Sequence, residues 1–302
     1  MKLLLTGMHK YTKENLKEIE ELGFDVYFHE NEREKIDFDV SEIEVVVCTD
    51  LFKVNEINKF KNLKYIQLLT VGFDTMPLDY LKEHNITLTN AKDTYAVPMS
   101  EWTILKLLEI LKKAREYYQN QENKLWKRDV NSLELNGRNV LLLGYGNVSK
   151  EIIKRLKAFD VNIFVNNRSK VDDKDITQIG LSKEELKDIE IVIVTLPLAI
   201  NTHHLVNEEF LKKLKDGVIL INLARGSIIN EADLIKALQN NKFSGLGLDV
   251  FEVEPLPKES PLWEDKRVYL TPHYSFFSEK LKVRQYNVLL AGLKEIIDKE
   301  QK

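Results

Sequence analysis

Short apolar runs alternate with polar, helix-like stretches along most of the chain, and this alternation constrains the fold more than any other feature. In the first ninety residues the apolar runs lie at residues 3–5, 26–28, 43–48, 65–69 and 86–88. Apolar runs of this length with helices between them are typical of βαβ units, whose strands are parallel. The pattern predicts a small parallel sheet of the flavodoxin-like kind over residues 1–92.

A second alternation begins at residue 140. Its apolar runs lie at residues 140–143, 161–165, 191–195, 218–222, 246–248 and 268–270. Continuous apolar runs fit parallel strands that are covered on both faces, because one-sided sheets alternate polar and apolar residues. Six such strands predict a doubly wound, Rossmann-like sheet and an α/β fold of two Rossmann-like domains.

The domain boundaries follow from the ends of these two alternations. Residues 93–274 are expected to form the nucleotide-binding domain. The last helix follows the last strand without a further sheet unit, and chain termini tend to lie close together. We therefore expect residues 275–302 to return to residues 1–92 and to complete a smaller substrate-binding domain.

Two segments between the sheets have patterns of their own. Apolar residues cover most of the circumference of a helix over residues 102–111, which predicts burial either inside the domain or in a subunit interface. Residues 116–128 include Tyr118, Leu125 and Trp126, more apolar surface than a flexible linker carries. We expect this segment to be a docked arm.

Composition narrows the classes of function. Hydrophobic residues make up 43% and charged residues 30%, as in ordinary folded proteins. The net charge of −4 gives no basic field for nucleic acid or for an anionic membrane, so neither is expected as a partner. The single cysteine, Cys48, excludes an internal disulfide, and no apolar run approaches roughly 18 residues. We expect a cytoplasmic protein that acts on small molecules.

A glycine turn follows the run at residues 140–143, in a chain with only 12 glycines. In dinucleotide sites one glycine makes the tight turn, a second lets the backbone approach the pyrophosphate, and a helix N-terminus holds the anion. Ser149 replaces a third glycine, and a small serine fits where helix and strand pack closely. The predicted pyrophosphate turn comprises Gly144, Tyr145, Gly146, Asn147 and Val148.

The next predicted strand ends at Asn166, where an acidic residue would bind the ribose hydroxyls of NAD. No carboxylate stands there. Asn167, Arg168 and Ser169 instead offer hydrogen-bond donors and a positive charge that suit a 2′-phosphate. This pattern predicts a preference for NADP(H), with NAD(H) as the other cofactor that the site could take; an exposed loop with ordinary charges is the alternative.

Three ionisable residues stand at the carboxyl ends of predicted strands, where open α/β sheets bind their ligands. They are Arg225, Glu254 and His273. Singly, each also fits an ordinary surface loop. Together their chemistries suit one active site. Guanidinium binds carboxylates, imidazole exchanges protons near neutral pH, and a neighbouring carboxylate favours protonated imidazole.

These motifs together resemble the D-isomer-specific 2-hydroxyacid dehydrogenase family, which includes phosphoglycerate dehydrogenases, glyoxylate/hydroxypyruvate reductases and D-lactate dehydrogenases. The resemblance rests on residues 144–149, 221–226, 248–257 and 271–273, in the family's order and spacing. It implies an NAD(P)-dependent oxidoreductase that interconverts a small 2-keto acid and a D-2-hydroxy acid, and it suggests a homodimer.

The resemblance also implies roles for single residues. Arg225 would hold the substrate carboxylate and polarise its carbonyl, His273 would be the acid/base, and Glu254 would raise the pKa of His273. Asp249 would contact the nicotinamide amide.

A loop of the first domain, at residues 70–74, resembles the family's substrate loop. Backbone N–H groups of Val71 and Gly72 would reach the substrate carboxylate, and a plain turn at the end of a strand is the alternative. The sequence departs from the common family pattern at Ser149, at Asn166 and at residues 98–102, which leaves cofactor choice and subfamily open.

Other functions fit only part of the pattern. C-terminal binding protein corepressors of the same family keep the three ionisable residues, so a nucleotide-sensing protein with little turnover is an alternative, although the chain lacks long extensions. A methyltransferase that binds S-adenosylmethionine would leave those residues without a shared purpose. His203 and His204 are adjacent and do not have metal-ligand spacing on a helix, so no metal site is expected. Trp263 is expected to pack its loop, with substrate contact as the alternative.

Overall fold

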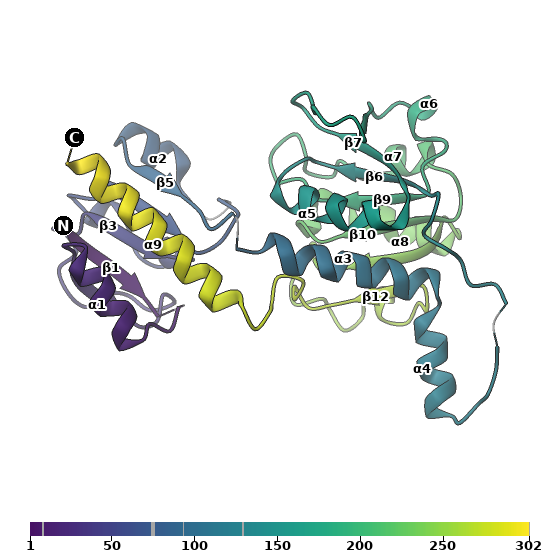
Figure 1. The fold of residues 1–302 in the computed structure, drawn as a ribbon, viewed down its shortest axis with the longest axis horizontal. Helices are drawn as coiled ribbons and strands as arrows, with labels where there is room; N and C mark the ends of the chain where they lie inside the picture. Colours follow the sequence, from purple (N-terminus) through teal and green to yellow (C-terminus); the bar gives the residue numbers. More distant parts are fainter. Residues whose placement is uncertain (8, 74–75, 93, 129, 302) are drawn as a thin grey trace. The chain divides into compact units, whose positions relative to one another are not determined.

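The computed structural model divides the chain into two compact units, Met1–Tyr95 with Ser278–Lys302, and Ala96–Phe277. It describes residues 1–7, 9–73, 76–92, 94–128 and 130–301. The boundaries expected from the sequence lie a few residues earlier at both junctions. Figure 1 shows each unit as an α/β layer structure built on a parallel sheet.

The first unit contains five parallel strands in the order β2-β1-β3-β4-β5. This order is that of flavodoxin-like folds, and it places the point where the winding direction changes between β1 and β3. The strands are β1 (Lys2–Thr6), β2 (Asp25–His29), β3 (Val45–Cys48), β4 (Tyr65–Leu68) and β5 (Thr87–Thr89), and the helices are α1 (Lys13–Glu21), α2 (Leu78–Glu83) and α9 (Leu281–Glu300).

Helices cover both faces of this sheet because its strands are apolar on both sides. Leu3 and Leu5 of β1 face a core that includes Leu289 and Leu293 of the C-terminal helix α9. Leu4, between them, faces the opposite core layer. The end of the chain therefore packs against the sheet that the start of the chain forms (Figure 1).

The buried carboxylate of Glu32 lies at the point between β1 and β3 where the winding direction changes. Glu32 is 3% exposed, and it accepts hydrogen bonds from the Thr6 hydroxyl, from Thr49 N (2.8 Å) and from Asp50 N (2.5 Å). Thr6 ends β1, whereas Thr49 and Asp50 directly follow β3. One side chain from the loop after β2 thus joins the carboxyl ends of two neighbouring strands.

The second unit contains seven parallel strands in the order β12-β11-β10-β9-β6-β7-β8. The prediction of a doubly wound α/β fold is confirmed. A two-residue edge strand, β8, was not foreseen. The strands are β6 (Asn139–Leu143), β7 (Asn162–Asn166), β8 (Thr177–Gln178), β9 (Ile191–Val194), β10 (Val218–Asn222), β11 (Phe243–Leu248) and β12 (Val268–Leu270), and the helices are α3 (Ala96–Leu111), α4 (Ala114–Glu122), α5 (Asn147–Leu156), α6 (Lys183–Leu186), α7 (Glu208–Lys213) and α8 (Glu231–Gln239).

Helix α3 packs against the sheet of the second unit over most of its circumference, while Leu105 stays exposed, so a subunit interface on that side remains a prediction. Trp102, Leu107 and Ile110 belong to the core layer between the sheet and helices α3 and α5. Glycines in β11 admit the helix at short range, since a Cβ atom at Gly245 would lie 2.3 Å from Ile110 Cγ2. None of the helices that the structure describes is both long and apolar enough to cross a membrane.

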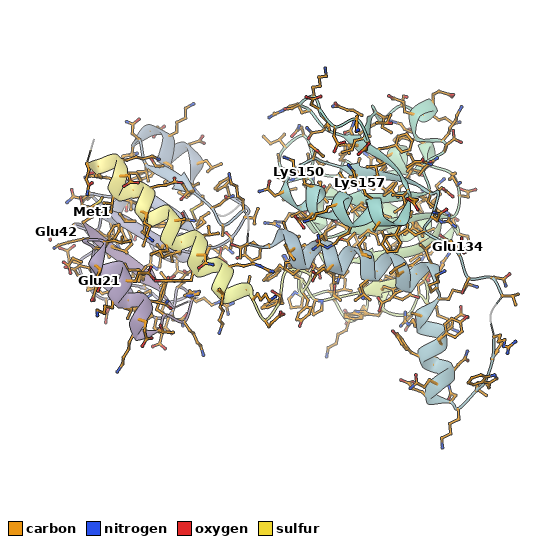
Figure 2. All side chains as sticks on the ribbon, in the orientation of Figure 1. Met1, Glu21, Glu42, Glu134, Lys150 and Lys157 are labelled. Atoms are coloured by element: carbon orange, nitrogen blue, oxygen red, sulfur yellow. The ribbon has the colours of Figure 1, made fainter. Side chains whose placement is uncertain are left out.

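The segment after α3 projects from the second unit, and the prediction of a docked arm is wrong for one chain. Trp126 is 95% exposed, and Tyr118 and Leu125 are also exposed. The arm is attached at its two ends: Arg115 Nη1 donates to the carbonyl of Val268 (3.1 Å), and Leu133 N donates to Leu111 O (2.9 Å). Glu134, labelled in Figure 2, marks the return to the sheet.

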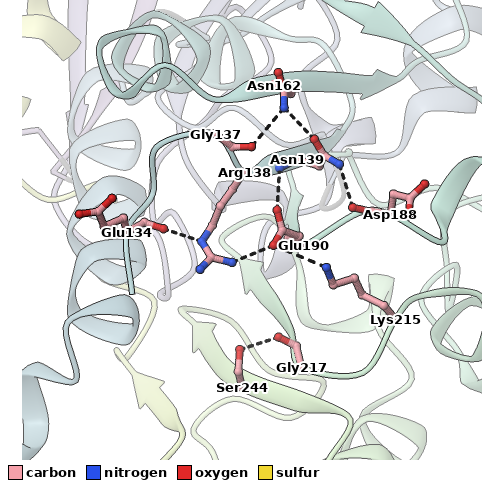
Figure 3. A network of polar contacts seen from close by, with 10 residues as sticks. All are labelled: Glu134, Gly137, Arg138, Asn139, Asn162, Asp188, Glu190, Lys215, Gly217 and Ser244. Carbon is pink, nitrogen blue, oxygen red and sulfur yellow. Dashed lines mark hydrogen bonds and ion pairs between the residues drawn. The ribbon is translucent and has the colours of Figure 1, made fainter. Parts of the chain in front are cut away.

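Polar side chains close the amino edge of the second sheet (Figure 3). Glu190, before β9, accepts from Arg138 Nη1 (2.9 Å) and from the backbone N–H of Asn139 at the start of β6 (3.1 Å). Lys215 lies 3.5 Å from the same carboxylate. These groups satisfy one another, and the loops at the carboxyl edge carry the residues of interest for chemistry.

A buried histidine in the first unit makes its stability depend on pH. His9, after β1, is 3% exposed, its ring stacks on Tyr286 at 6.0 Å, and its Nδ1 has no hydrogen-bond partner in the described part of the chain. Burial lowers the pKa of His9 below its ordinary value of 6.5.

We expect acid to destabilise the protein through His9. The unfolded chain takes up the proton at a higher pH than the folded chain, so the free energy of unfolding falls as the pH drops below about 6.5. Urea unfolding at pH 7.5 and 5.5 measures the loss, which His9→Phe should reduce. The exposed His84, changed to Gln, is the control; an equal reduction in both variants would contradict the assignment to His9.

Candidate active site

The glycine turn lies between β6 and α5. Gly144 has φ +106°, which disfavours any side chain there, and its N–H donates to Asn166 O (2.8 Å). Gly146 caps α5, and a Cβ atom at Gly146 would have no atom within 4 Å. This open space before the N-terminus of α5 leaves room for an anion to approach the helix.

Ser149 completes the turn in place of a third glycine. Its hydroxyl donates to Gly144 O (3.0 Å) and lies 2.7 Å from Thr195 Oγ1. The side chain is fully buried. Serine therefore supports close packing of helix and strand here by hydrogen bonding, and Thr195, at the end of β9, is a member of the turn that the sequence reasoning missed.

Two cations lie near this turn. Lys150 of α5, labelled in Figure 2, places Nζ 5.3 Å from the centre of the Tyr145 ring. Arg168 is exposed in the loop after β7, and the structure assigns it no ion pair among the residues that it describes. Gln178 of β8 holds this loop by donating to Asn167 O (2.8 Å) and Ser169 O (3.1 Å).

Asp249 is fully buried at the end of β11 and organises the loop that carries His273. Its Oδ1 accepts from the Thr271 hydroxyl (2.5 Å) and from Tyr274 N (2.7 Å), and Oδ2 accepts from Ser275 N (3.0 Å). In addition, His273 N donates to the backbone oxygen of Asp249 (2.8 Å). The sequence did not suggest this positioning role.

His273 and Glu254 are brought together from the loops after β12 and β11. His273 Nδ1 donates to Glu254 Oε2 at 2.9 Å, and Glu254 Oε1 accepts from Phe251 N (3.1 Å). The ring of Phe276 meets the imidazole edge to face at 5.8 Å. Because Nδ1 is engaged by the carboxylate, Nε2 is the ring nitrogen left to act on another molecule.

Arg225 lies in the loop after the neighbouring strand β10. Asn222 shapes this loop, since its side chain donates to Arg225 O (3.1 Å) and accepts from Ala224 N (3.1 Å). The backbone then passes directly against the Glu254 loop: a Cβ atom at Gly226 would lie 1.9 Å from the carbonyl carbon of Phe251. The Arg225 and Glu254 loops are therefore in backbone contact.

Val71 and Gly72 belong to the first unit and follow β4. Asn90 Nδ2 donates to Val71 O (2.6 Å), and Thr70 Oγ1 donates to Gly72 O (3.4 Å). Val71 is exposed. Asp74, in the same expected loop, lies outside the described residues.

Trp263, His203 and His204 were also considered from the sequence, and each contacts neighbouring residues of the second unit. Trp263 Nε1 donates to Pro257 O (2.9 Å), so the indole packs its own loop. The rings of His203 and His204 lie 3.9 Å apart, and His204 is hydrogen-bonded to Glu252. Among the side chains that the structure describes, no three His, Cys, Asp or Glu residues converge as metal ligands.

The seven-stranded sheet and the turn at Gly144 define a dinucleotide-binding domain of the Rossmann class. Residues 104–275 match the model for the NAD-binding domain of the D-isomer specific 2-hydroxyacid dehydrogenases. The chain belongs to this family, whose enzymes are nicotinamide-dependent oxidoreductases of 2-hydroxyacids.

Curated relatives cover most of the chain. A glyoxylate reductase from Thermofilum pendens is 30% identical over 284 residues, which are 89% of this chain and 83% of that protein. A hydroxypyruvate reductase from Thermotoga maritima is 32% identical over 240 residues, 78% of each protein. The crystal structure of a D-lactate dehydrogenase from Aquifex aeolicus, complexed with NAD and lactic acid, matches with TM-score 0.82 and 25% identity over 99% of this chain and 97% of that one.

Two glycine substitutions should have different effects, one on stability at the Arg225 and Glu254 loops and the other on nucleotide binding at the Gly144 turn. Gly226→Ala forces the Arg225 and Glu254 loops apart, so we expect about 1–3 kcal/mol of destabilisation, the usual cost of overpacking. Gly146→Ala meets no protein atom and should melt close to the unchanged protein, yet weaken nucleotide binding because the methyl group occupies the open side of the turn. Thermal unfolding and nucleotide titration measure both; equal melting temperatures of the two variants would contradict the prediction.

Proposed function

We propose that the protein reduces a small 2-keto acid to the D-2-hydroxy acid, with NADP(H) preferred over NAD(H). The observation that carries this proposal is the 2.9 Å hydrogen bond from His273 Nδ1 to Glu254 Oε2. A carboxylate in this position orients the ring and stabilises positive charge on it. The family membership and the glyoxylate and hydroxypyruvate reductases among the relatives support the same reaction.

His273 is assigned the proton transfer. In the protonated ring Nε2 carries the proton that the carbonyl oxygen receives on reduction, and Nδ1–H donates to Glu254, which leaves the neutral ring protonated on Nδ1 after the transfer. A nicotinamide cofactor whose pyrophosphate is bound at the Gly144 turn would supply the hydride for the carbonyl carbon. Hydride and proton together convert the C=O group to CH–OH, and the reverse transfer oxidises the hydroxy acid.

Arg225 is assigned the substrate carboxylate, because a guanidinium binds carboxylate bidentately and its charge polarises an adjacent carbonyl. A contact of the Val71 and Gly72 backbone N–H groups with a substrate carboxylate, which the resemblance of their loop implies, stays a prediction. The expected contact of Asp249 with the nicotinamide amide is not part of this proposal, because the side chain is fully buried and both of its oxygens accept hydrogen bonds from the His273 loop.

Arg168, Asn167 and Ser169 are assigned the 2′-phosphate of NADPH. Arg168 supports this assignment because it is exposed, while Gln178 holds the surrounding loop in place. A guanidinium binds phosphate oxygens through charge-assisted hydrogen bonds.

We also propose a homodimer formed through the projecting arm. Isolated exposed apolar residues are ordinary, but many of them on one segment are typical of an interface. The exposed apolar residues of the arm are Tyr117, Tyr118, Leu125, Trp126, Val130 and Leu133.

The reaction is tested by initial rates of NADPH and NADH oxidation against glyoxylate, hydroxypyruvate, pyruvate and branched 2-keto acids. We expect turnover with at least one of them, and a loss on the order of 10² to 10⁴ in His273→Ala, the usual contribution of a positioned proton donor. Near-normal turnover in His273→Ala would exclude the assigned acid/base. Tight nucleotide binding without turnover of any acid would favour a nucleotide-sensing protein instead.

Cofactor choice is tested by Arg168→Ala. Loss of a charge-assisted hydrogen bond costs about 1.5–3 kcal/mol, so we expect kcat/KM with NADPH to fall roughly 10- to 100-fold while kcat/KM with NADH stays unchanged. Lys154→Ala removes an exposed cation from α5 and serves as the control. Equal efficiency of the unchanged protein with NADPH and NADH would rule out the preference.

A further inference from the structure

A second histidine and a second carboxylate lie beside the assigned active-site residues. Glu252 is two residues before Glu254 in the loop after β11, and its Oε1 accepts a hydrogen bond from His204 Nε2. His204 comes from the loop between β9 and α7. Their side chains are 35% and 28% exposed, so water only partly screens the pair.

The other oxygen of Glu252 reaches a third segment. Glu252 Oε2 accepts from Glu231 N (3.4 Å), at the start of α8, and Glu252 N donates back to Glu231 Oε2 (3.2 Å). Burial raises the pKa of Glu231, and the negative charge of Glu252 acts in the same direction. Glu252 therefore links two segments. Its Oε1 accepts from His204 Nε2, and its Oε2 accepts from Glu231 N.

The backbone of His204 is attached to the Arg225 loop. His204 N donates to Ser227 O (2.8 Å), two residues after Arg225, and Val206 N donates to Ile228 O (3.1 Å). His204 itself has φ +51°, a left-handed conformation that is uncommon for residues other than glycine but less so for histidine than for most. The histidine thus contacts the Arg225 loop through its backbone and the Glu254 loop through its ring.

Three loops at the carboxyl edge of one sheet therefore meet around His204 and Glu252, and the bridge between Val206 and Ile229 also joins the first two of them. The loop after β9 contributes His204, the segment after β10 contributes the Ser227 carbonyl and the Glu231 amide, and the loop after β11 contributes Glu252. The segments after β10 and β11 also meet through the bond from Glu252 N to Glu231 Oε2 and through the close approach of Gly226 to Phe251.

We propose that His204 and Glu252 are positioning residues that hold the Arg225 loop and the Glu254 loop in one fixed arrangement. This inference rests on the proposed function, in which Arg225 binds the substrate carboxylate and Glu254 orients His273. Neither His204 nor Glu252 takes part in proton transfer. They act by keeping the guanidinium and the imidazole at the spacing that a 2-keto acid requires.

The test compares His204→Ala, His204→Gln and His203→Ala. Displacement of a catalytic group by about 1 Å costs up to roughly 100-fold, so we expect kcat/KM for the keto acid to fall 10- to 100-fold in His204→Ala. Nucleotide Kd should stay unchanged, because the Gly144 turn is intact. Gln places an N–H donor near the position of Nε2, and it should restore most of the activity.

His203 is the matched control because it is adjacent, exposed and outside the hydrogen bonds that join the loops in the described structure. Its variant should retain full activity. Identical kinetics of His204→Ala and His203→Ala, or a Gln variant as impaired as the Ala variant, would overturn the inference. If His204→Ala does not fold, Glu252→Gln, which keeps an acceptor for the Glu231 amide, gives the same comparison.

Hydrogen exchange at the amides of Phe251, Glu252 and Glu231 decides the matter without any turnover. We expect faster exchange at these amides in His204→Ala than in His203→Ala. If the unchanged protein reduces none of the acids, the proposed function fails, while faster exchange still supports the joining of the loops and unchanged exchange overturns it.

Discussion

The buried carboxylate of Asp249 is the constraint on which the active-site geometry depends. An ionised carboxylate away from water is costly unless donors surround it, and here the donors are a hydroxyl and two backbone N–H groups of residues 271–275. The chain after β12 has to follow the one path that supplies them. That path places His273 in a left-handed conformation, with its ring against Glu254. Glu254 depends in turn on the loop after β11, which begins at Asp249.

Polar groups at the amino and carboxyl edges of the second sheet have different roles. At the amino edge, Arg138, Glu190 and Lys215 satisfy one another and close the ends of β6, β9 and β10 (Figure 3). At the carboxyl edge, the polar groups hold loops in place, and Nε2 of His273 has no hydrogen bond to the residues that the structure describes. The groups that stabilise the sheet lie at the amino ends of the strands, and the residues proposed for chemistry lie at the carboxyl ends, as in open α/β sheets generally.

The sequence allowed the strands of the second unit to be predicted because runs such as residues 140–143 are buried on both faces. It did not reveal β8, because Thr177 and Gln178 are polar and exposed. The prediction of a docked arm was wrong because apolar composition does not show whether the same chain buries those side chains. The Gly144 turn was local in sequence and predictable; the joining of His204 to Glu252 spans 48 positions and depends on a tertiary contact.

Glu32 occupies backbone donors at the carboxyl edge of the first sheet. Both sheets are parallel, and each has a point where the winding direction changes and where anions commonly bind. In the second unit that end of the sheet presents a glycine turn and a helix N-terminus. In the first unit the amides of Thr49 and Asp50 already bind the carboxylate of Glu32, so the donors that would attract a phosphate are occupied by an anion that is part of the chain. A second phosphate would have to displace a covalently tethered competitor of the same sign. The two sheets share an architecture, and the Glu32 side chain makes their carboxyl edges differ in the backbone donors that stay open to an anion.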